Sequence, residues 1–184
     1  NTVLGECYFL RAFFYSELSK IFGEVPLILF ANEPVNYPKS PANITYAQIA
    51  LDLKNAIELL PSIPFNSIDP ERLGHATKWT AEALIARVYL FYTGYYQQSD
   101  LPLAEGGSVT KEMVIQYLND LINNSGHQLV DDYRNLWRYT NEYSEEDYPY
   151  VAGKGLNWAG DGNMEVIWSM KHGNAKQYGA SQHN

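Results

Sequence analysis

The sequence predicts an all-α fold in one domain, with long loops between the helices. Four stretches place apolar residues three or four positions apart, which is the spacing of one face of a helix. The chain has 184 residues, and 46% of them are hydrophobic, which is enough for one buried core. Only the short segment 166–168 is expected to form a strand.

The first helix is predicted from about Val3 to Phe22, ending before Gly23 and Pro26. Arg11 lies within its apolar stripe, and because an unpaired buried charge is costly, we expect it to pair with a carboxylate. Cys7 is interpreted as a small buried hydrophobe rather than a nucleophile. The residues expected to face the core are Leu4, Cys7, Tyr8, Phe14, Tyr15, Leu18, Ile21 and Phe22.

The second helix is predicted to begin at Thr45, which forms a capping box with Gln48, and to end at Pro61. A third helix should begin near Thr77. The fourth should follow Thr110 as its N-cap, and a helical turn is expected over 132–137. The predicted core positions are Tyr46, Ile49, Ala50, Leu53, Ile57 and Leu60, then Ala81, Leu84, Ile85, Val88, Phe91, Tyr92 and Tyr95, then Val114, Tyr117, Leu118, Leu121 and Ile122.

The end of the third helix resembles that of a tetratricopeptide hairpin. Leu90, Gly94 and Tyr96 give a small-then-aromatic spacing, and an amphipathic helix follows after a loop. Such hairpins hide their apolar faces by stacking on one another. A strict repeat of about 34 residues is absent. The prediction is therefore a single domain over 1–184 of tetratricopeptide-like helical repeats, with long loops at 23–44, 97–109 and 138–163.

Composition and motifs argue against several classes of function. A net charge of −8 disfavours nucleic-acid binding. One cysteine excludes an internal disulfide and a cysteine-built zinc site, and no apolar run is long enough to span a membrane. Phosphate-binding loops and serine nucleophile elbows are also absent. The four histidines are too scattered to form a metal-binding pair. We therefore predict a protein without cofactor, metal or catalytic residues.

Two clusters of acidic residues resemble catalytic or metal-binding patterns, but neither has the full set of residues that such a site needs. Glu145, Glu146 and Asp147 are consecutive, so they indicate a solvated turn rather than the two separated carboxylates of a glycosidase. Asp161, Asn163 and Glu165 alternate as in a calcium loop but lack the other ligands of an EF-hand.

The loop 138–163 contains the predicted ligand-binding residues. It is rich in aromatic residues, unlike a disordered linker. Aromatic faces stack on sugar rings, while amides and carboxylates bind sugar hydroxyls. Packing of Trp158 onto the helical core is the alternative to ligand contact and stays open, and Trp79 and Trp137 are interpreted as packing residues. The candidate ligand contacts are Trp158, Asn157, Tyr148, Tyr150 and Asp161.

Four segments together resemble the SusD/RagB family of nutrient-binding lipoproteins, in family order. They are Glu6–Pro26 (ECYFLRAFFYSELSKIFGEVP), Tyr46–Pro61 (YAQIALDLKNAIELLP), Gly74–Leu90 (GHATKWTAEALIARVYL) and Asn163–Met170 (NMEVIWSM). His75 stands where the family usually has arginine, so a contact at that helix start is expected to differ. The family's sugar-binding residues lie in variable loops, so none can be assigned to positions here.

The resemblance implies a fragment of a cell-surface lipoprotein of the outer membrane, which captures glycans for a SusC-like TonB-dependent transporter without acting as an enzyme. Such proteins are tethered through a lipidated N-terminal cysteine. Cys7 is not that anchor, because no signal peptide precedes it. Two alternatives stay open: a helical-repeat scaffold that docks a protein partner without binding sugar, and a hydrolase.

Overall fold

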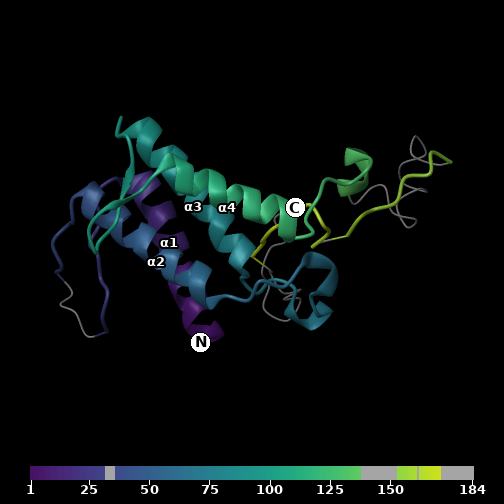
Figure 1. The fold of residues 1–184 in the computed structure, drawn as a ribbon, viewed down its shortest axis with the longest axis horizontal. Helices are drawn as coiled ribbons and strands as arrows, with labels where there is room; N and C mark the ends of the chain where they lie inside the picture. The colour runs from purple at the N-terminus through teal and green to yellow at the C-terminus, as the bar shows by residue number, and fades with distance from the viewer. Residues whose placement is uncertain (32–35, 138–152, 161, 171–184) are drawn as a thin grey trace.

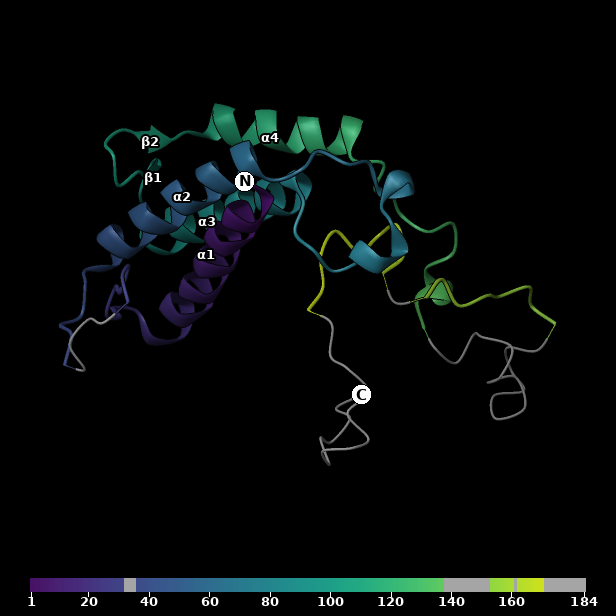
Figure 2. The ribbon, with the colours of Figure 1, turned by 90° about the horizontal axis from the view of Figure 1, so that it is seen from below.

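The computed structural model describes residues 1–31, 36–137, 153–160 and 162–170. Its four helices are α1 (Thr2–Phe22), α2 (Ala42–Leu59), α3 (Lys78–Tyr95) and α4 (Lys111–Asn124). Each helix packs against the next one in the chain, so the four form a consecutive array (Figures 1 and 2). The all-α prediction is confirmed, since the described part is mainly helical.

Short elements occupy the connections between the helices. The strands β1 (Leu101–Pro102) and β2 (Ser108–Val109) form an antiparallel hairpin within the predicted loop 97–109. Three 3-10 turns, η1 (Phe65–Ser67), η2 (Pro70–Arg72) and η3 (Tyr133–Leu136), follow α2 and α4. The turn η3 confirms the one expected over 132–137. The predicted strand at 166–168 was wrong, because Ile167 lies in a bend and its two neighbours belong to no regular element.

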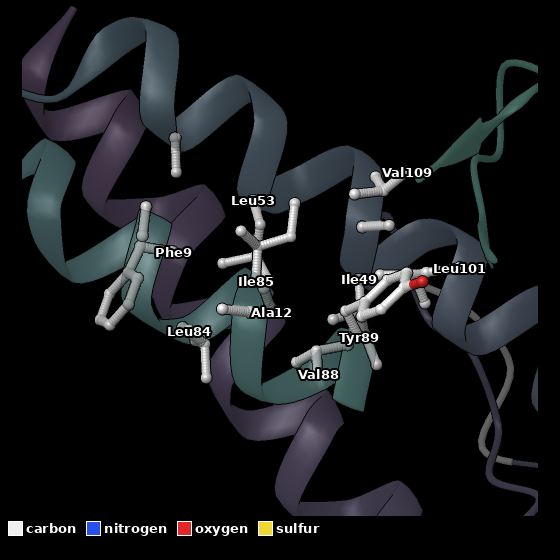
Figure 3. Close-up of a cluster of buried hydrophobic side chains, with 14 of the residues drawn as sticks. Phe9, Ala12, Ile49, Leu53, Leu84, Ile85, Val88, Tyr89, Leu101 and Val109 are labelled. Atoms are coloured by element: carbon white, nitrogen blue, oxygen red, sulfur yellow. The ribbon is translucent and has the colours of Figure 1, made fainter. Parts of the chain in front are cut away.

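The core lies between α1, α2 and α3, and the hairpin closes one end of it. Figure 3 shows Phe9 and Ala12 of α1 meeting Leu53 of α2 and Ile85 of α3. Near the hairpin, Leu101 and Val109 are fully buried. Most predicted core positions of α2 and α3 are buried, but Tyr95 is 71% exposed because it lies in the last turn of α3.

The predicted core face of α1 was wrong. The residues that α1 buries are Gly5, Phe9, Ala12, Ser16 and Ser19. A Cβ added at Gly5 would lie 3.1 Å from Leu59 Cβ, which means that small side chains let α1 approach α2 closely. The apolar stripe predicted to face the core is instead largely solvent-facing, Cys7 included, and only Tyr8 and Tyr15 of it are partly covered.

The carboxylate partner of Arg11 is Asp52 of α2. The guanidinium donates two hydrogen bonds of 2.7 Å to the two carboxylate oxygens, and Gln48 donates a third of 2.8 Å. Asp52 is 1% exposed. The expected ion pair is confirmed, and it fastens α1 to α2.

The start of α2 differs from the prediction. The helix begins at Ala42 after Pro41, so Thr45 is a buried residue of the first turn and not a cap. Gln48 uses its side chain to bind Asp52 rather than the helix start. The predicted starts of the third and fourth helices are confirmed. Thr77 forms a capping box with Thr80 at α3, and the Thr110 hydroxyl accepts from the Met113 amide at α4.

A buried carboxylate, Glu82, lies between α3 and α4. It is 1% exposed, and neither of its oxygens has a hydrogen-bond partner. Lys78 Nζ lies 3.5 Å from Glu82 Oε1, but it is closer to Asp120 Oδ2, at 2.5 Å. Burial raises the pKa of Glu82 to about 7, while the hydrogen bond from Lys78 lowers the pKa of Asp120. Ionised Glu82 therefore destabilises the fold.

We expect Glu82→Gln to abolish a pH dependence of stability. The unfolded carboxyl has a pKa of 4.5 and the folded one about 7, so the folded state binds more protons between these values. The contribution of Glu82 to the free energy of unfolding is therefore greatest below pH 4.5, and it is lost as the pH rises through about 7. At pH 8 the variant should be more stable than the natural protein by up to about 3 kcal/mol. Urea unfolding at pH 5 and pH 8 measures this, with Glu58→Gln, at an exposed site on α2, as the control.

Candidate functional site

Two of the five predicted ligand-binding residues lie in the described part of the chain. Asn157 is exposed and Trp158 is partly buried. Tyr148, Tyr150 and Asp161 lie outside the described residues, as do Glu145, Glu146 and Asp147. The segment 153–160 projects away from the helical array, beside η3 (Figure 1).

Asn135 of η3 holds the segment in place. Its side-chain Oδ1 accepts from the Asn157 amide at 3.0 Å, and its backbone oxygen accepts from the Ala159 amide at 2.7 Å. Trp158 lies between these two anchored residues. Gly155 and Gly160 flank them with φ of 66° and 85°, a left-handed conformation that glycine adopts at little cost. The backbone around Trp158 is thus fixed against η3.

Two further aromatic residues belong to the same extension: Tyr133 of η3 and Trp137, which directly follows it. Tyr133 is 71% exposed and Trp137 is 52% exposed, so the packing role predicted for Trp137 is at most partial. The exposed side-chain amide of Asn157 makes one long hydrogen bond of 3.5 Å, to the Gly155 oxygen. We call Tyr133, Trp137, Asn157 and Trp158 the aromatic–amide surface. It combines flat apolar faces with hydrogen-bonding groups, as binding of a sugar ring requires.

The turn η3 is fixed electrostatically as well. Asp132 accepts hydrogen bonds from the backbone amide of Arg134, at 3.0 Å, and from its guanidinium. These bonds lower the pKa of Asp132 to about 2, so the carboxylate stays ionised across the physiological range. The sequence indicated this turn, because an aspartate side chain can accept a hydrogen bond from the backbone amide two residues further along and so cap a turn.

The segment 162–170 returns to the helical array and fastens the extension to it. The Met164 oxygen accepts from the Gln128 amide at 3.2 Å, and Glu165 accepts from the Val130 amide at 3.1 Å. Trp168 packs edge-on against Phe9 and Phe13, with ring centroids 5.0 and 5.1 Å away. Trp168 was predicted to lie in a strand, and its anchoring contacts with α1 have no signal in the sequence.

His75 and Trp79 also have structural roles. His75 Nδ1 lies 2.7 Å from Glu6 Oε1, so this histidine links the residues before α3 to α1. Trp79 is buried and donates to the Ile63 oxygen at 2.9 Å, which confirms its predicted packing role.

The two hollows described in the structure differ greatly in size. One, beneath the segment 162–169, has a volume of about 30 Å³, which is far below the several hundred Å³ of a typical ligand pocket. The other is an open groove of about 520 Å³ along α1 and α2. Tyr8 and Phe30 line it together with the Arg11–Asp52 pair, whose two charged groups already bind each other.

Other site types receive no support from the described residues. Within those ranges, no three His, Cys, Asp or Glu side chains come together as metal ligands would. None of the described helices has the length and apolar character needed to cross a bilayer. Glu165 and Asn163, from the weak calcium pattern, bind backbone amides of the loop instead.

Comparison with known proteins gives consistent matches. A SusD-like family model described as "Starch-binding associating with outer membrane" matches residues 1–90. A SusD-like protein of Bacteroides ovatus is 29% identical over 151 residues, covering 78% of this chain and 24% of the relative. The crystal structure of a SusD-like protein from Bacteroides fragilis is 30% identical, with a TM-score of 0.59, covering 95% of this chain and 28% of its own.

A laminarin-binding SusD-like protein is 27% identical, with a TM-score of 0.57, covering 76% of this chain and 28% of its own. The chain thus spans about a quarter of the length of these relatives. The first three of the four segments noted in the sequence lie within residues 1–90, which the family model matches. The family model and these relatives together support a protein of the SusD/RagB family.

Proposed function

We propose that the whole protein binds oligosaccharides at the cell surface and delivers them, unmodified, to a SusC-like TonB-dependent transporter of the outer membrane. The observation that carries the proposal is the match of residues 1–90 to a family described as starch-binding and associated with the outer membrane. A laminarin-binding relative with the same fold adds support for a glycan ligand. The lipid-anchored location belongs to the same proposal.

Within this chain, the proposed contact region is the aromatic–amide surface. Tyr133 offers an exposed face for stacking on a sugar ring, Trp158 offers a partly buried ring, and Asn157 offers an amide to the sugar hydroxyls. Tyr148, Tyr150 and Asp161, the other predicted contacts, remain part of the proposal. Since the chain covers about a quarter of its relatives, other parts of the whole protein are expected to contribute to the pocket.

The proposed activity is binding without bond cleavage. Glycoside hydrolysis needs two carboxyl groups that flank the scissile bond at about 5–10 Å from each other. Two described carboxylates of this region are already engaged: Asp132 is paired with Arg134, and Glu165 accepts from a backbone amide. Incubation of the whole protein with a glycan panel should release no new reducing ends.

We expect Trp158→Ala in the whole protein to weaken oligosaccharide binding about tenfold or more, because a stacking face is lost. Calorimetric titration with the glycan that binds best in an oligosaccharide array measures this. The control is Tyr95→Ala, which removes an exposed aromatic ring in the last turn of α3, away from the aromatic–amide surface (Figure 1).

Equal affinity of the Trp158→Ala and Tyr95→Ala variants would reject the aromatic–amide surface but not glycan binding. Absence of binding to every glycan, together with capture of the transporter, would favour the protein-interaction scaffold instead. Binding of glycan without any transporter capture would reject the delivery step alone.

A further inference from the structure

The helix α1 is apolar on two opposite sides. One side carries Gly5, Phe9 and Ala12 into the core against α2 and α3 (Figure 3). At 100° per residue, the opposite side gathers a second apolar stripe. Seven of its members are between 39% and 73% exposed, and Cys7 is exposed as well. We call this stripe the outer face of α1: Val3, Leu4, Cys7, Leu10, Phe14, Leu18, Ile21 and Phe22.

An uncovered stripe of this kind is unusual for a soluble protein. Apolar residues scattered singly over a surface are ordinary, but a contiguous apolar patch marks a contact site. A helix that is apolar all round is typically enclosed on both sides. In helical-repeat proteins, the helix that ends the array has a polar outer face, which keeps the protein soluble. The outer face of α1 therefore has the apolar composition of a helix inside an array, and not the polar composition of a helix at its end.

The other edge of the array provides a contrast. The exposed residues of α4 are mainly polar or charged, with Ile115 and Ile122 as the large apolar exceptions. They include Lys111, Glu112, Gln116, Asn119, Asn123 and Asn124. The composition expected of an outward-facing helix is thus found on α4 and not on α1.

Two observations indicate what covers the outer face. The chain spans 24% of the length of its curated relative, so most of the whole protein lies outside it. Consecutive elements of a chain usually lie next to each other, and α2, which follows α1, already occupies the inner side. We propose that a helix of the segment preceding Asn1 in the whole protein packs on the outer face, so that α1 is sandwiched within a longer array.

The open groove along α1 and α2 fits the same proposal. Leu4 and Cys7 of the outer face also line the groove, next to Tyr8 and Arg11. A helix seated on the outer face would close this wall of the groove. The groove is then a boundary between two parts of one fold, and it needs no separate ligand.

Cys7 is a natural probe of this interface. In the whole protein, at concentrations where it is monomeric, we expect the Cys7 thiol to react with a thiol reagent about 100-fold more slowly than an open thiol, because reaction requires local opening. Mass spectrometry of the peptide containing Cys7 follows the labelling. The control is Glu58→Cys on the exposed side of α2. Both thiols should react equally fast in urea.

Three outcomes would overturn the proposal. Cys7 labelling as fast as the Glu58→Cys control would mean that the outer face is open. Protection that disappears on dilution to the monomer would assign the face to a second copy. Protection that appears only after the transporter is added would assign it to that partner.

A substitution gives an independent readout. Leu18→Glu in the whole protein would place a charge in the proposed interface, and the folding equilibrium constant should fall about 100-fold or more. Gln116→Glu, on the exposed side of α4, is the matched control and should change little. An unchanged urea midpoint for Leu18→Glu would contradict the sandwiched arrangement.

Discussion

Replacing Asp52 with alanine should destabilise the fold by about 3 kcal/mol, at the lower end of the range for breaking a buried ion pair. Asp52 is 1% exposed and accepts three hydrogen bonds, two from Arg11 and one from Gln48. Its removal leaves the guanidinium without a partner inside the α1–α2 contact. We choose the lower end because the Arg11 side chain is 29% exposed and can partly reach water.

Urea unfolding of Asp52→Ala at neutral pH provides the measurement. Gln48→Ala is the matched control, since it removes only the third hydrogen bond and should cost about 1 kcal/mol. The double variant Arg11→Met with Asp52→Leu should recover most of the loss, because no charge then remains buried. A loss below about 1 kcal/mol for Asp52→Ala would mean that the pair does not fasten α1 to α2.

The helices could be predicted from the sequence because periodicity and end signals are local. Thr77 and Thr110 cap helices where the spacing of apolar residues begins, and Gly23 follows the last residue of α1. The ion pair of Arg11 could be predicted in kind, since charge inside an apolar stripe demands a partner. Its identity could not, because Asp52 is 41 positions away along the chain.

The packing of α1 could not be predicted, because the helix has two apolar sides and periodicity does not rank them. The side with the larger residues was chosen, yet Gly5 and Ala12 allow the closer approach to α2. Of the candidate site, the sequence indicated the aromatic loop but not its docking on η3. That docking depends on Asn135, whose hydrogen bonds to Asn157 and Ala159 have no periodic signal.

Trp168→Ala should lower stability by about 3 kcal/mol, within the range for truncating a packed aromatic residue. The indole packs against Phe9 and Phe13 and donates from Nε1 to the Gly74 oxygen at 3.0 Å. The change therefore removes ring packing on α1 and a link to the residues just before α3. Trp168→Phe keeps a ring but loses the hydrogen bond, and it should cost about 1 kcal/mol.

A comparison of Trp168→Ala with Trp158→Ala separates anchoring from binding. Trp158 lies on the projecting extension, so its removal should change the urea midpoint little while it weakens glycan affinity. Trp168→Ala should do the reverse: the fold is weaker, but the molecules that remain folded bind glycan as before, since Trp168 packs on α1. Titrations at a temperature well below the unfolding transition of both variants measure this. If Trp158→Ala destabilised the protein as much as Trp168→Ala does, Trp158 would be the core plug, and the aromatic–amide surface would lose its central residue.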